Sequence, residues 1–334
     1  MNVSAMARQP VREVWPLECL VYERSVSLGL ALHPSTHRAY SSHLNSYLTF
    51  CRLHGFPIAL TPDTLSFYVV FMSHYIQPRS VDNYLSGIVS QLEPHFPEVR
   101  AVRNSNLVQR TLRGSLRHFS RPVVRRQPLS RMHLLHALNS FPRPFAFDNL
   151  CWLAQLLCGF FGLLRLGELV SAPSDDTFAQ LSSRSSVRFD ASFFSFVVPR
   201  QKSDLFHEGT MVRIVSSPLA DDPHTLFLQY LAYRDASFPL HPLLWIRADR
   251  SLPTHAWFLA RFRTVFPDPS LGGHSLRSGG ATSLAAAGVP PSQIQAIGAW
   301  SSLAWQRYVR KHPVLLQTLL FHGRPLHDPP FAFL

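Results

Sequence analysis

The stretch HSLRSGGAT, residues 274–282, places a histidine and an arginine three residues apart in a segment that reads as a helix. Residues at positions i and i+3 of a helix lie on one face, so His274 and Arg277 would face the same neighbour. Taken by itself, such a pair is most often an ordinary surface pair. It becomes informative together with four further positions on either side of it.

Those four positions are scattered over the second half of the chain. Arg165 lies in LLRLGEL (163–169), at the end of the apolar run Leu150–Leu164, and Lys202 lies in RQKSD (200–204) between two segments that read as strands. Trp300 lies in GAWSS (298–302) and Tyr308 in QRYVR (306–310). Each has an ordinary structural interpretation: a helix cap, a solvated turn lysine, a core tryptophan and a tyrosine at the rim of a core. No single position supports a function.

In this order, the succession Arg…Lys…His-x-x-Arg…Trp…Tyr resembles the tyrosine recombinase (phage integrase) family. The local sequences LLRLGEL, HSLRSGGAT and GAWSSLAWQRYVR (298–310) are similar to those of the family. In the first half, HPSTHRAYSSHLNSYLTFC (33–51) and QPRSVDNYLSGI (77–88) resemble its helical core-binding domain. The resemblance covers roughly residues 18–325. The GAWSS and RYVR segments are most similar to recombinases of eukaryotic mobile elements, such as Crypton-type transposons and DIRS-type retrotransposons.

Two features depart from the pattern of the phage enzymes. Trp300 stands where many members of the family carry a second histidine, although other members carry tryptophan there. Tyr308 follows Trp300 by eight residues, where phage and bacterial enzymes commonly show nine. Positions 307 and 309 are arginine and valine, so no neighbouring tyrosine competes with Tyr308.

The chemistry of strand transfer explains why these residue types are needed. A covalent intermediate conserves the energy of the phosphodiester bond, and Tyr308 is the predicted nucleophile. The transition state carries extra negative charge on its non-bridging oxygens, which two planar, permanently charged guanidinium groups can hold. Arg165 and Arg277 are the predicted pair. Lys202 is predicted to protonate the leaving 5′ oxygen, and His274 to assist proton transfer from the tyrosine or to bind the phosphate.

Two further residues are predicted to support this site. Trp300 would pack against it and donate its indole N–H. Glu168 would fix Arg165 or His274 without reacting itself. We find no cluster of carboxylates for two metal ions in the sequence, which argues against a metal-dependent nuclease or transposase, and we expect neither a metal nor a cofactor.

The chain is predicted to be mainly α-helical, with a small antiparallel β-sheet in the catalytic domain. An arm (1–17) would precede a helical core-binding domain (18–119), followed by a basic linker (120–128), a catalytic domain (129–325) and a tail (326–334). The predicted helices begin near Thr36, Thr61, Ser80, Asn106, Ser130 and Asp148, and the last of these would run to Val170 before Pro173. Short strands are predicted near Val187, Phe194–Val198 and Met211–Val215.

The charge balance indicates a polyanionic partner. The net charge is +12 over 334 residues, and nucleic acid is the commonest partner of such a chain, although a membrane surface or plain solvation remains an alternative. The residues predicted to contact DNA are Thr36, Arg38, Arg121, Arg125 and Arg126. The family resemblance further implies a homotetramer working on two double-stranded DNA sites through a Holliday junction.

The sequence also bears on the cellular compartment and on alternative functions. Four cysteines without a CxxC pair, and a beginning that lacks an apolar signal segment, predict a chain that is not secreted: nuclear if eukaryotic, cytoplasmic otherwise. Two rivals stay open, a DNA-binding protein that has lost catalysis and a type IB topoisomerase. The complete set of six residues argues against the first. The helical first domain and the HSLR sequence argue against the second.

Overall fold

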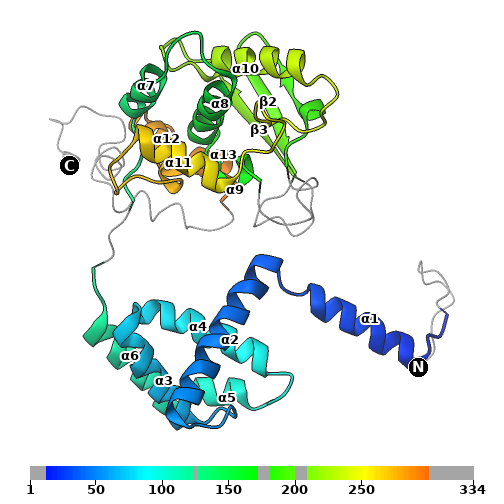
Figure 1. The fold of residues 1–334 in the computed structure, drawn as a ribbon, viewed down its shortest axis with the longest axis vertical. Helices are drawn as coiled ribbons and strands as arrows, with labels where there is room; N and C mark the ends of the chain where they lie inside the picture. Colours follow the sequence, from blue (N-terminus) through cyan, green and yellow to red (C-terminus); the bar gives the residue numbers. More distant parts are fainter. Residues whose placement is uncertain (1–12, 123–125, 172–180, 200–208, 301–334) are drawn as a thin grey trace, which may run out of the picture. The chain divides into compact units, whose positions relative to one another are not determined.

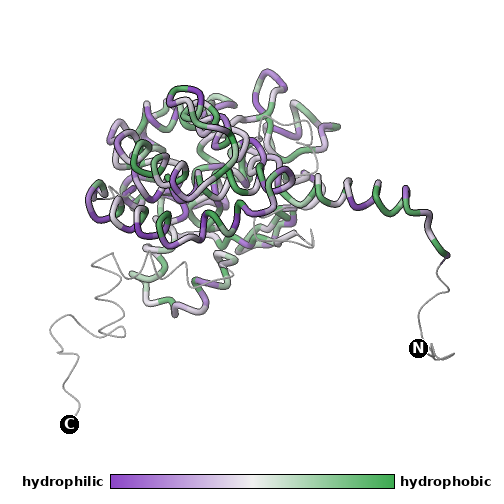
Figure 2. Tube along the Cα trace, turned by 90° about the horizontal axis from the view of Figure 1, so that it is seen from below, coloured by the Kyte–Doolittle hydropathy of each residue, from purple (hydrophilic) through white to green (hydrophobic). Residues whose placement is uncertain are grey.

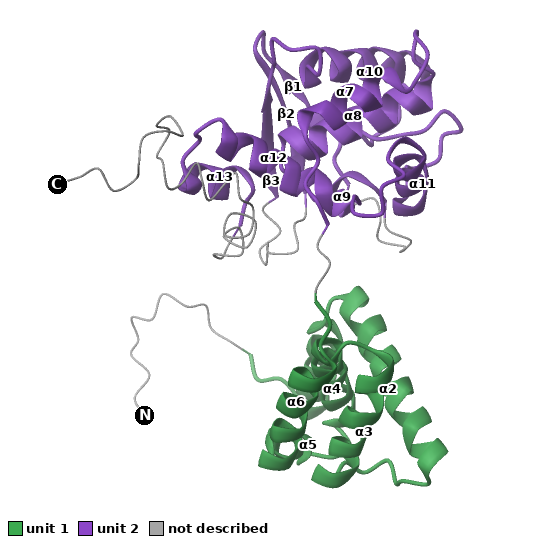
Figure 3. Cartoon of the chain, turned by 90° about the vertical axis from the view of Figure 1, so that its left-hand side faces the viewer, with its two compact units in different colours: residues 1–123 green, residues 124–334 purple. Residues whose placement is uncertain are grey.

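A computed structural model describes residues 13–122, 126–171, 181–199 and 209–300 of the chain. The chain divides into two compact units, residues 1–123 and residues 124–334 (Figure 3). The units are mainly α-helical and the second contains one small antiparallel sheet, so the predicted fold class is confirmed. Within the described ranges, no helix is both long enough and apolar enough to cross a membrane.

The first unit consists of helices around an aromatic and aliphatic core. Helix α2 packs on α4 and α3 packs on α6, while α5 joins α4 to α6 (Figure 1). The core between them is built on Tyr47, Phe50, Tyr68 and Ile88, all almost fully buried. The helices are α1 (Leu17–Leu30), α2 (Pro34–His54), α3 (Pro62–Tyr75), α4 (Pro78–Leu92), α5 (Val99–Asn104) and α6 (Asn106–Phe119).

Proline occupies the first position of three of these helices, α2, α3 and α4. Helix α2 begins at Pro34, two residues before the predicted Thr36. His33 caps the helix, and its ring nitrogen accepts a hydrogen bond from the backbone N–H of Ser35. Pro34 occupies the first helical position, where its fixed φ suits a helix and its missing N–H costs nothing. Pro78 likewise starts α4 two residues before the predicted Ser80.

The other predicted boundaries of this unit agree with the structure. Thr61 caps α3 through a reciprocal capping box with Thr64, and Asn106 begins α6. Gly55 ends α2 in the left-handed conformation, with φ of 69°, which glycine adopts without steric cost. The arm was predicted to extend to residue 17, whereas α1 already begins at Leu17.

The second unit is built around helix α8 (Phe147–Phe161). Every residue of α8 from Leu150 to Phe160 is buried, because α10 and α12 pack on it and α7 lies beside it. The remaining helices are α7 (Arg131–Asn139), α9 (Leu166–Leu169), the 3-10 turn η2 (Arg184–Ser186), α10 (Pro223–Ser237), α11 (His255–Val265), α12 (His274–Ala286) and α13 (Pro291–Ile297).

The small sheet covers one side of this core. Its strands run in the order β1 (Arg188–Phe189), β2 (Phe193–Val198) and β3 (Thr210–Val215), each antiparallel to its neighbour, as predicted. On the inner face, Phe194 stacks on Phe227 of α10 with ring centroids 4.1 Å apart. The sheet is thereby fixed to the helices by aromatic packing.

One predicted helix is shorter than expected. The segment predicted as a single helix from Asp148 to Val170 ends at Phe161, and α9 follows after a turn; Pro173 lies outside the described residues. A Cβ on Gly162 would lie 3.0 Å from the side chain of Val212, so β3 approaches the chain closely where the helix stops. Leu163 then adopts a φ of 50°. The apolar run did not reveal this turn, because nearly all of its residues are buried in the turn as well as in the helix.

The segment predicted as a linker is anchored at both described ends. The backbone N–H of Arg121 donates to the side chain of Gln77 in the first unit. The backbone N–H groups of Gln127 and Leu129 donate to the carbonyl oxygens of Ser270 and Ser275 in the second unit. Residues 126–129 therefore belong structurally to the second unit.

Candidate active site

Glycines allow helix α12 to lie directly against α8. A Cβ on Gly280 would stand 1.9 Å from the carbonyl oxygen of Phe160, and one on Gly279 would stand 2.4 Å from that of Leu129. Because backbone atoms cannot yield like the tip of a flexible side chain, no larger residue fits at either position. The SGGAT part of the 274–282 stretch thus brings α12 close enough to bury Arg277, which is only 2% exposed.

The turn after α8 presents Arg165 beside Glu168. One carboxylate oxygen of Glu168 accepts a hydrogen bond from the Arg165 guanidinium at 2.8 Å, and the other accepts from its backbone N–H at 2.8 Å. The carboxylate is 6% exposed and the guanidinium 34% exposed. Glu168 therefore holds both the backbone and the side chain of Arg165. This is one of the two roles predicted for Glu168, which were to fix Arg165 or to fix His274.

Glu168 also lies beside Arg277. A guanidinium nitrogen of Arg277 lies 4.0 Å from a Glu168 carboxylate oxygen, and another donates to the carbonyl oxygen of Gly298 at 2.5 Å. Two guanidinium groups, one from the turn before α9 and one from α12, thus meet at one carboxylate. A single buried carboxylate leaves this cluster with net positive charge, which suits it to receive an anion.

His274 stands at the first position of α12, next to the same cluster. Burial among neighbouring atoms lowers its pKa, and the positive charges of Arg277 and Arg165 lower it further. Both effects penalise the imidazolium form, so the ring is held neutral below the pH at which an ordinary histidine takes up a proton. A neutral imidazole can accept a proton from a reacting group.

Trp300 closes the other side of Arg277. The guanidinium carbon of Arg277 lies 4.4 Å from the centre of the indole ring, within the range of a cation–π contact. The ring is 8% exposed and packs with Leu163, Ala281 and Ile294. A Cβ on Gly298 would lie 2.0 Å from the indole, so the ring occupies the space that glycine leaves.

The structure thus brings together five of the predicted residues: Arg165, Glu168, His274, Arg277 and Trp300. It also adds groups that the sequence did not single out. The carbonyl oxygen of Gly298 binds Arg277, and the side-chain amide of Gln295 donates to the Trp300 carbonyl at 3.1 Å. A backbone carbonyl carries no sequence signal, and Gln295 becomes relevant only once the chain has folded.

Two predicted catalytic residues, Lys202 and Tyr308, lie outside the described residues. The strand pair that flanks Lys202 is described: Val198 of β2 pairs with Thr210 of β3, so Lys202 belongs to the connection between adjacent antiparallel strands. Tyr308 follows Trp300 by eight residues.

The residues predicted to contact DNA are divided between the two units. Thr36 is half-buried and Arg38 exposed in the first turns of α2, while Arg121 is exposed at the end of the first unit. Arg126 belongs to the second unit, where its guanidinium lies 3.4 Å from the carbonyl oxygen of Leu271 just before α12. Arg125 lies outside the described residues.

Helix α6 carries a basic face that this set omits. Its buried residues are Val108, Leu112 and Ser115, whereas Arg110, Arg113 and Arg117 are exposed. The arginines are spaced by three and four residues, which places them on one face of the helix. The spacing of these arginines at the helical period could have identified this basic face from the sequence alone.

No group of three histidine, cysteine or acidic side chains that could hold a metal ion occurs in the part of the chain that the structure describes.

Comparisons with known proteins identify the fold. The sequence matches no protein-family model, and no curated protein matches it significantly. Among solved structures, it is similar to the XerH site-specific recombinase bound to its difH substrate in a pre-cleavage complex. The TM-score is 0.55 and the identity 15%, over 82% of this chain and 75% of that chain. The architecture is therefore that of the tyrosine recombinases.

Two further structures support the same fold. The Tn1549 transposon integrase in complex with transposon right-end DNA gives a TM-score of 0.57 at 14% identity, over 87% of this chain and 93% of that chain. A lambda integrase dimer bound to a COC′ core site gives a TM-score of 0.54 at 13% identity, over 87% of this chain and 94% of that chain.

Proposed function

We propose that this chain is a site-specific DNA recombinase that cleaves and rejoins duplex DNA through a 3′-phosphotyrosine intermediate. The observation that carries the proposal is the convergence of Arg165, His274, Arg277 and Trp300 around the Glu168 carboxylate. These side chains come from α9, α12 and the segment after α13, and they meet in a fold shared with DNA recombinases.

The cluster suits a phosphodiester in charge and in geometry. Arg277 is held by Glu168, Gly298 and Trp300, and Arg165 is held through both its backbone and its guanidinium. Guanidinium groups that are positioned before the substrate arrives can stabilise developing charge without reorganising, which is where electrostatic catalysis gains most. The two arginines would hold the non-bridging oxygens of the scissile phosphate.

The reaction balances with groups of this chain. The phenolic oxygen of Tyr308 attacks phosphorus, the bond from phosphorus to the 5′ oxygen breaks, and the DNA 3′ end becomes joined to the tyrosine. His274, kept neutral by its surroundings, would accept the phenolic proton, while Lys202 would donate one to the departing 5′ oxygen. The reverse sequence, with a new 5′ hydroxyl as nucleophile, rejoins the strand.

We infer that duplex DNA binds through the basic residues of both units. Arg110, Arg113 and Arg117 form an exposed row on α6, and Arg38, Arg121 and Arg126 add further charge. Such contacts to phosphate oxygens give affinity and register without reading the sequence. Four copies on two DNA sites would exchange strands in pairs through a Holliday junction.

The biological setting is inferred from the resemblance in sequence. The similarity of GAWSS and RYVR to Crypton-type and DIRS-type recombinases supports a role in moving a transposable element. A nuclear location would follow for a eukaryotic element and a cytoplasmic one for a bacterial element.

Trapping the covalent intermediate tests the proposal. Binding sites selected from a randomised duplex pool would be remade with a 5′-bridging phosphorothiolate, whose thiolate leaving group rejoins poorly. We expect the wild-type chain to form a protein–DNA adduct that survives boiling in detergent. Tyr308→Phe removes only the phenolic oxygen, so it should bind equally well and form no adduct.

The matched control is Tyr233→Phe, which changes an exposed tyrosine of α10 in the same unit and should leave the adduct unchanged. An adduct with Tyr308→Phe would show that another residue is the nucleophile. Binding without any adduct from the wild-type chain would favour a DNA-binding protein without catalysis. Plasmid relaxation without recombination would favour a topoisomerase.

A further inference from the structure

The side chain of Gln155 lies inside helix α8, where every residue from Leu150 to Phe160 is buried. Its exposed fraction is 0%, and it is the only buried asparagine or glutamine in the part of the chain that the structure describes. Its amide nitrogen donates to the backbone carbonyl oxygen of Leu169 at 2.7 Å. Its amide oxygen is buried too and accepts no hydrogen bond from any described residue.

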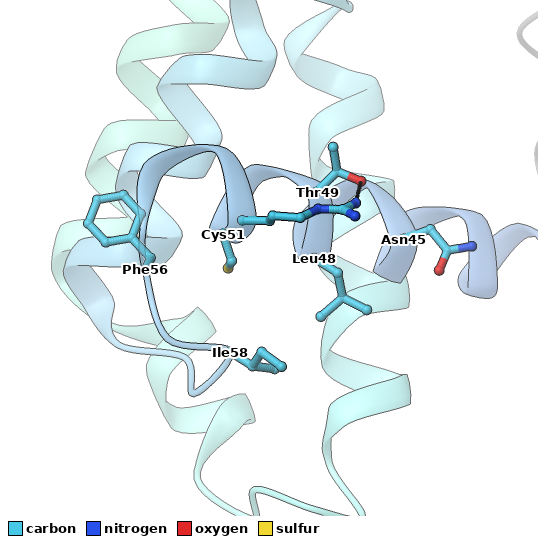
Figure 4. Close-up of a pocket in the computed structure, with 7 residues that line it drawn as sticks. Asn45, Leu48, Thr49, Cys51, Phe56 and Ile58 are labelled. Atoms are coloured by element: carbon cyan, nitrogen blue, oxygen red, sulfur yellow. Dashed lines mark hydrogen bonds between the residues drawn. The ribbon is translucent and has the colours of Figure 1, made fainter.

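Polar side chains on helices of the first unit are found where water reaches them. Figure 2 shows hydrophilic positions recurring along α1, the helix next to the N-terminus, which has no buried residue. In the groove along α2, the exposed side chain of Arg52 donates to the exposed hydroxyl of Thr49 at 3.4 Å (Figure 4). An amide oxygen buried without a donor instead lowers the free energy of unfolding, so the stability of the core does not explain Gln155.

The acceptor of the Gln155 amide is the last residue of α9, a helix of only four residues. A helix this short is not stable by itself, so contacts with other elements decide where it lies. Before α9, the backbone N–H of Leu164 donates to the carbonyl oxygen of Gly159 at 3.0 Å. After α9, the backbone N–H of Ser171 donates to the carbonyl oxygen of Pro253 at 2.8 Å. The bond from Gln155 fixes the end of α9 between these two points.

The face of α8 that carries Gln155 is also the face that α9 and α12 approach. Gly159 follows Gln155 by four residues and therefore lies on the same face. A Cβ on Gly159 would stand 2.5 Å from the side chain of Leu276 in α12 and 3.1 Å from that of Leu169 in α9. Helix α8 thus contacts Leu169 twice, through its side chain at Gly159 and through its carbonyl oxygen at Gln155.

The position of α9 relative to α12 determines the geometry of the candidate active site. Glu168 directly precedes Leu169, and its carboxylate lies 2.8 Å from the Arg165 guanidinium and 4.0 Å from that of Arg277. Arg165 and Glu168 move with α9, whereas His274 and Arg277 move with α12. A shift of α9 would therefore separate the two arginines that share the carboxylate.

We propose that Gln155 is a positioning residue for this cluster: its amide fixes α9 at the distance from α12 at which Arg165 and Arg277 meet at Glu168. Because Gln155 is fully buried, it acts on DNA only through these residues. Its importance for the reaction rests on the proposed function, whereas its effect on the cluster is measurable without DNA.

The first variant is Gln155→Met, which keeps an unbranched side chain of similar length and removes the amide. It should slow single-turnover cleavage at saturating protein roughly ten-fold to a hundred-fold, because a misplacement of about 1 Å can cost the larger factor. DNA affinity should hardly change, since Gln155 is not exposed. An unchanged rate would overturn the inference.

The His274 ring reports on the same geometry in the absence of DNA. Burial and the charges of Arg277 and Arg165 lower its pKa. In Gln155→Met, α9 should move away from α12 and take Arg165 with it, so the pKa of His274 should rise, as measured by NMR titration of the ring. A slower reaction with an unchanged His274 pKa would contradict the proposal. This titration decides the inference even if the chain cleaves no DNA.

The matched control is Trp152→Phe, which removes another fully buried donor from the same helix. The indole N–H of Trp152 donates to the backbone carbonyl oxygen of Phe258 in α11 at 3.1 Å, away from α9. This variant should melt at a lower temperature, yet keep the wild-type cleavage rate and His274 pKa. Equal changes in both variants would show that any lost bond of α8 has the same effect, and the specific role of Gln155 would be wrong.

A double variant tests whether Gln155 acts through the arginine. Added to Arg165→Ala, Gln155→Met should slow cleavage much less than it slows the wild-type chain, because the side chain that it positions is gone. Slowing by the same factor in both backgrounds would contradict the proposal.

Hydrogen exchange in the wild-type chain provides a test that does not depend on the folding of any variant. The side-chain amide protons of Gln155 should exchange slowly with solvent, because they are buried and one is bonded to the Leu169 carbonyl. Exchange as fast as that of an exposed glutamine would exclude the bond on which the inference depends.

Discussion

The interiors of the two units contain different kinds of polar side chain. The buried polar residues of the first unit are Thr64, Ser66, Ser73 and Ser115, all neutral and hydroxyl-bearing. Among the described residues, every buried charged side chain belongs to the second unit: Glu168, Asp221, Arg234 and Arg277. Burying a charge is costly unless the fold supplies partners, so charge is buried where structure or chemistry requires it.

The two buried arginines of the second unit have different roles. Arg234 donates to the carbonyl oxygens of Phe238, His241 and Leu243, and ties the segment after α10 to that helix. Arg277 instead lies beside another arginine across a single carboxylate. Like charges brought together are unfavourable in a structural core, and they become useful when an anion joins them.

The largest expected effect is on stability at Glu168. Glu168→Gln should lower the free energy of unfolding of the second unit by about 3–5 kcal/mol, because it leaves buried Arg277 without its carboxylate. The control in the first unit is Asp82→Asn, which removes the partner of Arg103 in an exposed pair and should cost no more than about 1 kcal/mol. Urea denaturation followed by circular dichroism measures both, and equal destabilisation would contradict the contrast between the units.

The second largest effect is expected on the rate of DNA cleavage. Arg277→Ala and Arg165→Ala should each slow single-turnover cleavage by roughly 10²–10³, the usual cost of losing one donor to a developing oxyanion. DNA affinity should change much less. Arg113→Ala on α6 serves as the control and should leave the rate unchanged at saturating protein. If affinity and rate fall together in the Arg277 variant, the residue is an ordinary phosphate contact.

A smaller effect is expected from the basic face of α6. Replacing Arg110, Arg113 and Arg117 together by alanine should weaken DNA binding on every sequence alike. The slope of log K against log salt concentration should become shallower by about 0.9 for each phosphate that an arginine no longer neutralises. An unchanged slope, measured by fluorescence anisotropy over a salt series, would remove α6 from the DNA interface.

The smallest effect is the titration of His274. Its pKa lies below the ordinary value of about 6.5, so it should stay neutral as the pH falls through that value. Between the folded and the unfolded pKa, the unfolded chain binds more protons, and the second unit should lose stability as the pH falls through this window. NMR titration of the ring checks this, and Arg165→Ala should raise the pKa because it removes a positive neighbour.

Local sequence was sufficient for most element boundaries. Thr61 and Ser130 predicted helix starts because their hydroxyls accept from backbone N–H groups three residues on, and both do so. The short β-type run Phe194–Val198 predicted a strand that the sheet contains. Where the boundary depended on packing, as at Phe161, the prediction was wrong, because a continuous apolar run is equally compatible with a helix and with a buried turn.

The sequence by itself determined the fold class and the candidate residues, since residue types at given spacings report local structure and chemistry. Only the tertiary structure decided that the Glu168 carboxylate lies beside both Arg165 and Arg277, and that the Trp300 ring packs on Arg277. Residues 165, 277 and 300 are far apart along the chain. Their meeting depends on the close approach of α12 to α8 at Gly279 and Gly280, and contacts of that kind arise from packing between helices rather than from any local pattern.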